Sequence, residues 1–128
     1  MKKCIYIISI LFSIVLSSQD LYWYDVILEV ESEDTLEFEK TVDEFYSSVD
    51  FPKDVTMTFS TIPLKGQGYE ETHILSFVSP SSESLANLRS SLTGEKWENY
   101  LEVVRPFIDG VRSSAGNASM IYNPDLFY

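Results

Sequence analysis

The chain has 128 residues, of which 45% are apolar and 14% aromatic, and it carries 20 Asp and Glu against 9 Lys and Arg. That length is enough for one domain with one hydrophobic core. The formal net charge of −11 argues against nucleic acid and anionic membranes as partners, because both would be repelled.

The N-terminus has the pattern of a secretory signal peptide. Lys2 and Lys3 precede an apolar run that ends near Leu16, and small residues predict cleavage after Ser17 or Ser18. Residues 1–17 are then the signal and 19–128 a single domain. The run is short for a membrane-spanning helix. We expect an exported protein, periplasmic or secreted, without an integral membrane span after cleavage; a retained anchor is the alternative.

Cleavage also removes Cys4, the only cysteine, and leaves seven basic side chains against 20 acidic ones, a formal charge of −13. The mature chain can then form no disulfide, no thiolate metal site and no cysteine nucleophile. With one His and no mature Cys a zinc site is not expected, and no calcium loop or phosphate loop is visible. We expect no cofactor and no metal.

The first half of the mature chain predicts a strand, a helix and a hairpin. Residues 21–30 alternate with period 2, and the set that includes Val26 and Leu28 is the better core face. A helix should follow, capped by Ser32 or Asp34, with an apolar stripe from Phe38 to Val49. Strands are predicted at 55–64 and 72–79, joined by a turn that contains Gly66 and Gly68.

The second half predicts a broken helix and a last strand. A helical region opens after Pro80, and Thr93-Gly94 interrupts it. Apolar residues then recur at helical spacing from Trp97 to Val111, with a kink expected near Arg105 because Pro106 lies inside the stripe. A strand is plausible at 119–123, and the tail after Pro124 is apolar enough to dock.

This order, β-α-β-β-α-β, predicts an α+β, ferredoxin-like fold: a four-stranded antiparallel sheet with two helices on one face, the second broken near Gly94 and kinked near Pro106. The uncovered sheet face would be too apolar for water. A two-fold homodimer that packs two such faces together is the simplest arrangement, and the face could also bind a small apolar ligand. The residues expected on this ligand or dimer face are Trp23, Ile27, Thr58, Ser60, Ile62, Leu75 and Phe77.

The strand that ends at Val30, the helix after Asp34 and the segments Glu83–Leu88 and Glu95–Tyr100 resemble the dimeric α/β-barrel superfamily, with its NIPSNAP-like and antibiotic-biosynthesis-monooxygenase-like proteins. The resemblance covers most of the mature chain and implies a dimer with a pocket between sheet and helices. Members include cofactor-independent oxygenases and haem-binding proteins. The haem-degrading members use a helical histidine, whereas the only histidine here lies in a predicted strand.

Three side chains are candidates for acid–base chemistry. His73 has an unperturbed pKa near neutrality and could act as a general base. Asp25 and Glu29 alternate with Trp23 and Ile27 and would be partly desolvated on a covered face. The alternatives are a strand-end histidine paired with a glutamate, and two solvated acids.

The sequence contains no diagnostic catalytic motif. Our leading hypothesis is an exported acidic dimer that binds a small apolar or aromatic ligand, or a protein partner, through the open sheet face. The first alternative is a cofactor-independent oxygenase or isomerase that uses Asp25 or His73 for proton transfer. The second is a structural subunit associated with the envelope.

Overall fold

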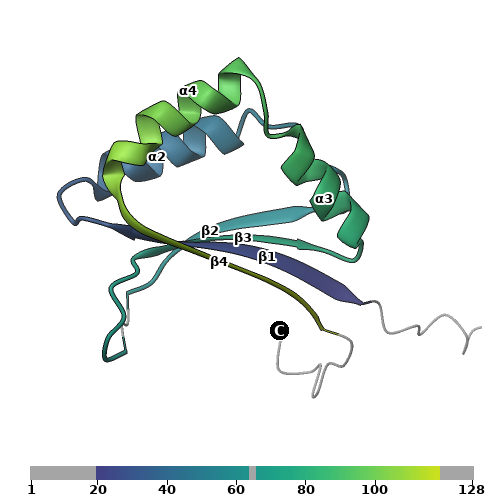
Figure 1. Ribbon diagram of the computed structural model, residues 1–128, viewed down its shortest axis with the longest axis horizontal. Helices are drawn as coiled ribbons and strands as arrows, with labels where there is room; N and C mark the ends of the chain where they lie inside the picture. The colour runs from purple at the N-terminus through teal and green to yellow at the C-terminus, as the bar shows by residue number, and fades with distance from the viewer. Residues whose placement is uncertain (1–19, 64–65, 119–128) are drawn as a thin grey trace, which may run out of the picture.

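The computed structural model describes residues 20–63 and 66–118 and contains one four-stranded antiparallel sheet with the strand order β2-β3-β1-β4. Three helices lie on one face of this sheet, and among the described residues no helix or strand covers the other, which we call the bare face (Figure 1). The predicted ferredoxin-like fold is therefore confirmed. The elements in chain order are β1 Leu21–Val30, α2 Thr35–Tyr46, β2 Thr56–Thr61, β3 His73–Ser79, α3 Ser82–Ser91, α4 Glu95–Val104, the 3₁₀ turn η1 Arg105–Phe107 and β4 Ile108–Ala118.

Helix α2 packs on the sheet through one apolar stripe. Phe38, Val42, Phe45 and Tyr46 are buried, at the i, i+4, i+7 and i+8 positions that share a helix face. The helix begins after Asp34, but the Asp34 side chain makes no capping hydrogen bond. Capping by the Asp34 side chain was therefore predicted wrongly, whereas the predicted start of the helix is confirmed.

Helices α3 and α4 are separate because of Gly94. The Ser81 hydroxyl caps α3 by accepting a hydrogen bond from the Ser84 amide at 3.2 Å. Gly94 then adopts φ 84° and ψ −177°, a conformation that is nearly exclusive to glycine. The chain turns there and α4 begins at Glu95.

The last strand lies earlier than expected. Helix α4 ends at Val104 and Pro106 sits in η1, so the apolar residues Ile108 and Val111 belong to β4 and not to a helical stripe. The predicted helix up to Val111 was wrong because Pro106 ends the α-helical ladder instead of kinking it. The strand expected at 119–123 lies outside the described residues, as do the signal segment 1–17 and the tail after Pro124.

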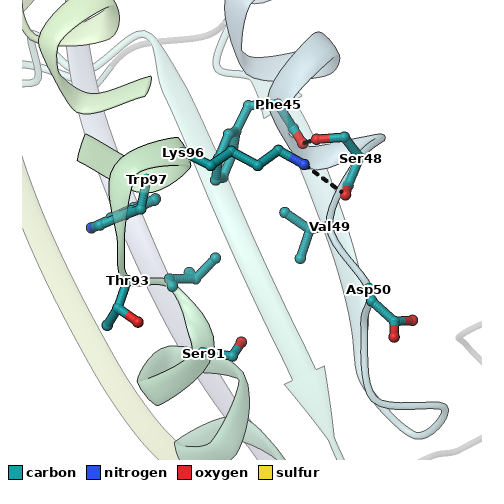
Figure 2. Close-up of a pocket in the computed structure, with 9 residues that line it drawn as sticks. Phe45, Ser48, Val49, Asp50, Ser91, Thr93, Lys96 and Trp97 are labelled. Carbon is teal, nitrogen blue, oxygen red and sulfur yellow. Dashed lines mark hydrogen bonds between the residues drawn. The ribbon is translucent and has the colours of Figure 1, made fainter. Parts of the chain in front are cut away.

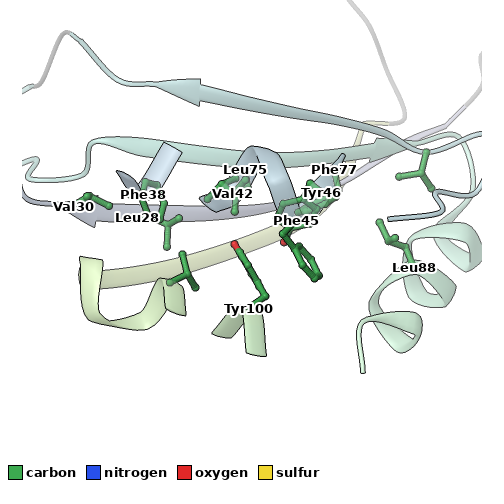
Figure 3. Packing of buried hydrophobic residues seen from close by; sticks show 12 residues of the cluster. Leu28, Val30, Phe38, Val42, Phe45, Tyr46, Leu75, Phe77, Leu88 and Tyr100 are labelled. Atoms are coloured by element: carbon green, nitrogen blue, oxygen red, sulfur yellow. The ribbon is translucent and has the colours of Figure 1, made fainter. Parts of the chain in front are cut away.

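The hydrophobic core fills the space between the sheet and the three helices (Figure 3). Strands β1 and β3 are the central strands of the sheet. Their side chains form one side of the core, and side chains of α2 and α4 form the other. In the described part of the chain, no helix is long and apolar enough to cross a bilayer. The buried apolar residues are Leu28, Val30, Phe38, Val42, Phe45, Tyr46, Val55, Leu75, Phe77, Leu88, Tyr100 and Val104.

Candidate functional site

His73 lies in the core and is not at the surface. The residue is 1% exposed, and its ring packs against those of Phe38 and Phe59, with centroids 5.0 and 5.5 Å away. Nδ1 is 2.7 Å from the Thr72 hydroxyl and Nε2 is 3.2 Å from a carboxylate oxygen of Glu39. The expected glutamate partner is present, but it comes from α2 and not from the neighbouring Glu70 or Glu71. His73 therefore ties α2 to β3.

Asp25 and Glu29 lie on the opposite side of the sheet from His73. In β1 they alternate with Leu28, which shares the helix-covered face with His73, its partner in the β1–β3 pairing. Asp25 accepts a hydrogen bond from the Ser76 hydroxyl at 2.5 Å. The structure therefore does not bring the three candidate acid–base residues together.

The bare sheet face is built from cross-strand rows, in which one residue from each strand stands beside the next. Two of the rows have an apolar centre, Val78 with Trp23 and Ile74 with Ile27, and the row between them has the hydrogen-bonded pair Ser76 and Asp25. From β2 to β4 the rows are Thr56-Val78-Trp23-Gly116, Thr58-Ser76-Asp25-Ser114 and Ser60-Ile74-Ile27-Arg112.

Leu75 and Phe77 do not belong to this face, which corrects the prediction for both. They are 3% and 4% exposed and pack in the core under the helices. The register was ambiguous in the sequence because both alternating sets of β3 contain apolar residues. Trp23, Ile27, Thr58 and Ser60 have the register of the bare face, and Ile62 follows β2 with the same alternation.

Trp23 can pack on the bare face because residue 116 is a glycine. A Cβ atom added at Gly116 would overlap the indole ring, so the ring lies flat over the glycine backbone of the neighbouring strand. Any side chain at position 116 would force Trp23 to move. The result is a flat aromatic surface on a part of the sheet that no helix covers.

An ion pair joins the exposed arginine of the last of these rows to a buried carboxylate. Arg112 of β4 pairs with the Glu71 carboxylate, which precedes β3, so the guanidinium reaches across β1. The Glu71 side chain is 8% exposed and its Oε2 has no hydrogen-bond partner among the described residues. A carboxylate buried in this way is stabilised mainly by its cation, and losing Arg112 would leave it unpaired.

A largely apolar cavity lies on the other side of the sheet, between α4 and strands β1 and β4. Its volume is about 520 Å³, within the range of small-molecule sites. Aromatic and aliphatic side chains form most of its wall, and among the described residues Arg105 and Asp109 are the only charged ones that line it. The full lining is Tyr24, Val26, Leu28, Tyr46, Leu75, Trp97, Tyr100, Leu101, Val104, Arg105, Ile108, Asp109, Gly110 and Val111.

Two buried phenols give this cavity its hydrogen-bonding groups. The hydroxyls of Tyr46 and Tyr100 share a hydrogen bond, and Tyr100 stacks on Phe45 with a centroid distance of 4.0 Å. Burial raises the pKa of Tyr46 to about 12 and raises the pKa of Tyr100 further. Both phenols are therefore neutral at physiological pH and can donate or accept a hydrogen bond.

Three other hollows differ in chemistry. Where α2, α3 and α4 meet, a cavity of about 240 Å³ is lined by Phe45 and Trp97, and the Lys96 ammonium donates to the Ser48 carbonyl oxygen at 3.1 Å (Figure 2). An acidic hollow of about 400 Å³ lies at the end of β1, and a small one of about 40 Å³ lies under Leu85. Within the described ranges, no group of three or more acidic, His or Cys side chains could hold a metal ion.

Comparison with known proteins supports the fold. No family model and no curated protein sequence matches the chain. Among solved structures, it is similar to a NIPSNAP family protein from Agrobacterium tumefaciens, with 13% identity over 75% of this chain and 90% of that one and a TM-score of 0.59. It is also similar to a candidate antibiotic biosynthesis monooxygenase from Caulobacter crescentus. The identity is 14% over 84% of this chain and 95% of that one, with a TM-score of 0.55.

A third similar structure is a dimeric ferredoxin-like protein of unknown function from Thermobifida fusca, with 6% identity over 81% of this chain and 96% of that one and a TM-score of 0.55. At these identities the likeness concerns the fold alone. The predicted resemblance to NIPSNAP-like and antibiotic-biosynthesis-monooxygenase-like proteins is confirmed at that level.

Proposed function

We propose that this protein is an exported binding protein that holds a small aromatic or apolar molecule in the cavity between α4 and the sheet, and that two copies pair through the bare sheet face. The cavity is the observation on which the proposal depends. It lies on the helix side of the sheet, so ligand binding and pairing use different surfaces.

The cavity wall favours an aromatic occupant. Trp97, Tyr100 and Tyr24 contribute ring surface, and aliphatic side chains from β1 and α4 complete the wall. Buried apolar surface supplies most of the binding free energy in such sites, and a few polar groups orient the ligand. Here the neutral hydroxyls of Tyr46 and Tyr100 would take that orienting role.

The proposed pairing rests on the composition of the bare face. Trp23, Ile27, Ile74 and Val78 form two apolar row centres on the central strands, whereas the outer strand β2 contributes Thr and Ser. These apolar row centres flank the hydrogen-bonded pair Ser76 and Asp25, and protein interfaces usually combine apolar patches with satisfied polar groups. A second copy offers the same surface, which a two-fold axis can match to itself.

Proton-transfer catalysis by Asp25 or His73 has less support. Neither residue lines the cavity, and His73 is buried against two phenylalanine rings. Glu29 lines the acidic hollow at the end of β1 and not the apolar cavity. No observation favours proton-transfer catalysis, or the role of an envelope subunit, over ligand binding.

Filling the cavity tests the proposal. In Leu101→Trp a larger side chain enters the wall, so we expect the mature protein to bind the neutral dye Nile red at least about tenfold more weakly than wild type. Dye fluorescence titration measures the change. Leu36→Trp is the matched control, because Leu36 is 81% exposed on α2 and should leave binding unaltered.

Thermal unfolding of each variant separates a filled cavity from a misfolded chain. Equal dye binding by wild type and a folded Leu101→Trp variant would reject the cavity as the binding site. A wild-type protein that does not bind the dye would reject the proposal itself.

A further inference from the structure

The rim of the apolar cavity carries one cation and one anion, and neither is neutralised within the described residues. Arg105 and Asp109 both line the cavity and are both exposed. Among the described residues, each lacks an ion pair with the other or with any other side chain.

Two irregular backbone features bring these charges to the same rim. Arg105 opens the 3₁₀ turn η1, and Asp109 follows that turn as an extra residue in β4. The β1–β4 register pairs Val30 with Ile108 and Glu29 with Gly110, so Asp109 has no partner on β1. A bulge of this kind aims a side chain away from the regular alternation and is common beside binding sites.

Inside the rim the cavity contains no charged side chain. Its polar groups there are the phenols of Tyr24, Tyr46 and Tyr100, and Tyr46 and Tyr100 stay neutral at physiological pH. A ligand with charges must therefore keep them at the rim and place its uncharged part inside, because an unpaired charge in an apolar cavity is costly. Trp97 and the tyrosine rings suit an aromatic group in that inner part.

We infer that the ligand is zwitterionic: a free aromatic amino acid, whose carboxylate binds Arg105 and whose ammonium binds Asp109. This inference rests on the proposed cavity function and adds the chemical class of the ligand. The arginine fork matches a carboxylate with two parallel hydrogen bonds. The carboxylate of Asp109 offers acceptors to an ammonium.

Asp109 also lines the acidic hollow that contains Glu29, Glu31 and Glu70. Arg105 lines the cavity but not that hollow, and it is the one cation on the cavity wall. The carboxylate and the ammonium of a zwitterion would therefore bind at different positions along the rim.

Four related probes test the inference by calorimetry on the mature protein: indole, indole-3-propionate, tryptamine and tryptophan. Exposed ion pairs are weak, so we expect each charged group to strengthen binding about two- to fivefold over indole, and tryptophan to bind best. Added salt should reduce these differences, because the rim is open to solvent.

Two variants assign each charge to its residue. Arg105→Gln should lower the affinity for tryptophan and indole-3-propionate about two- to fivefold and leave tryptamine unaffected or slightly favoured. Asp109→Asn should lower the affinity for tryptophan and tryptamine and spare indole-3-propionate. Lys40→Gln and Asp43→Asn make the same charge changes on exposed positions of α2 and should alter none of the four.

The outcomes separate this inference from the cavity proposal. If indole itself does not bind, the cavity function fails. If indole binds, but tryptophan binds no better and neither rim variant alters the order of the probes, the cavity stands and the zwitterionic ligand is rejected. Binding of only the anionic or only the cationic probe would also reject it, in favour of a singly charged ligand.

Discussion

The tyrosine pair Tyr46 and Tyr100 joins α2 to α4 over the cavity. Their ring centroids are 5.8 Å apart, and Phe45 stacks on Tyr100 from the same helix as Tyr46. These hydroxyls have a hydrogen-bond partner in each other, so their burial is tolerated while they remain protonated. Their ionisation would place a negative charge in the core.

Alkaline pH should therefore destabilise the fold. The pKa of Tyr46 is raised from 10.0 to about 12 by burial, so between these values the unfolded chain releases a proton that the folded chain keeps. Stability is fully present below pH 10 and is lost as the pH rises toward 12, by at most about 1.4 kcal/mol per pH unit for this group.

Replacing Tyr46 tests this dependence. Because Tyr46→Phe has no proton to release, its free energy of unfolding should fall less steeply above pH 10 than that of wild type. Urea unfolding over a series of alkaline pH values measures the slope. Tyr69→Phe, at a position that is 63% exposed, should keep the wild-type slope; equal slopes in all three proteins would contradict the prediction.

At the level of single residues, the sequence predicted a carboxylate partner for His73 but not the burial of its ring. A glutamate partner for His73 was foreseen, but the residue is in the core, because Glu39 and Thr72 supply the hydrogen bonds that a buried histidine needs. Nothing in the local sequence shows that a helix 34 residues away supplies one of them. Asp25 and His73 lie on opposite faces of the sheet. The sequence did not show this, because both alternating sets of β3 contain apolar residues.

Among the elements, the link between α3 and α4 depends on a single backbone conformation. Gly94 has φ 84° and ψ −177°, and a Cβ added there would meet nothing within 4 Å. The glycine is therefore required for its backbone angles and not for lack of space. This break sets the direction of α4, which carries Trp97, Tyr100 and Leu101 to the cavity wall.

Gly94→Ala should destabilise the protein by about 1–3 kcal/mol, because alanine is strained at these angles. Urea unfolding at neutral pH measures the loss. Asn99→Ala, at an exposed position inside α4, should change the free energy of unfolding by no more than about 0.5 kcal/mol. A Gly94→Ala variant as stable as wild type would show that the break tolerates side chains.

The elements also show where sequence patterns fail. Period-2 alternation located β1, and helical spacing located α2. The same spacing misled at β4, because Val104, Ile108 and Val111 lie three or four residues apart across a change from helix to strand. From Ser113 onward β4 is made of small residues with weak strand preference, and its pairing with β1 determines its conformation.

For the molecule as a whole, the proposed pairing through the bare sheet face predicts the state of assembly. Wild-type mature protein should have the native mass of a dimer by light scattering. Ile27→Lys places a charge in an apolar row centre and should shift the mass toward the monomer, since an unpaired charge would be buried between copies. Leu36→Lys, on the exposed side of α2, should remain dimeric.

A monomeric wild type would remove the pairing proposal and leave the cavity proposal intact. A dimeric Ile27→Lys variant would instead place the contact elsewhere on the molecule. The resemblance implied a pocket between the sheet and the helices, but the sequence did not show that Tyr100 and Trp97 line one. Such residues look alike in sequence whether they fill a core or surround a hollow.

The chain contains two tryptophans, and the sheet separates them. Trp23 lies over Gly116 on the bare face, whereas Trp97 lines the cavity under α4. Their intrinsic emission is therefore a built-in pair of optical reporters for two different events. In Trp23→Phe the remaining signal would follow occupancy of the cavity, and in Trp97→Phe it would follow the meeting of two sheets, so the order of filling and pairing can be timed without an added label.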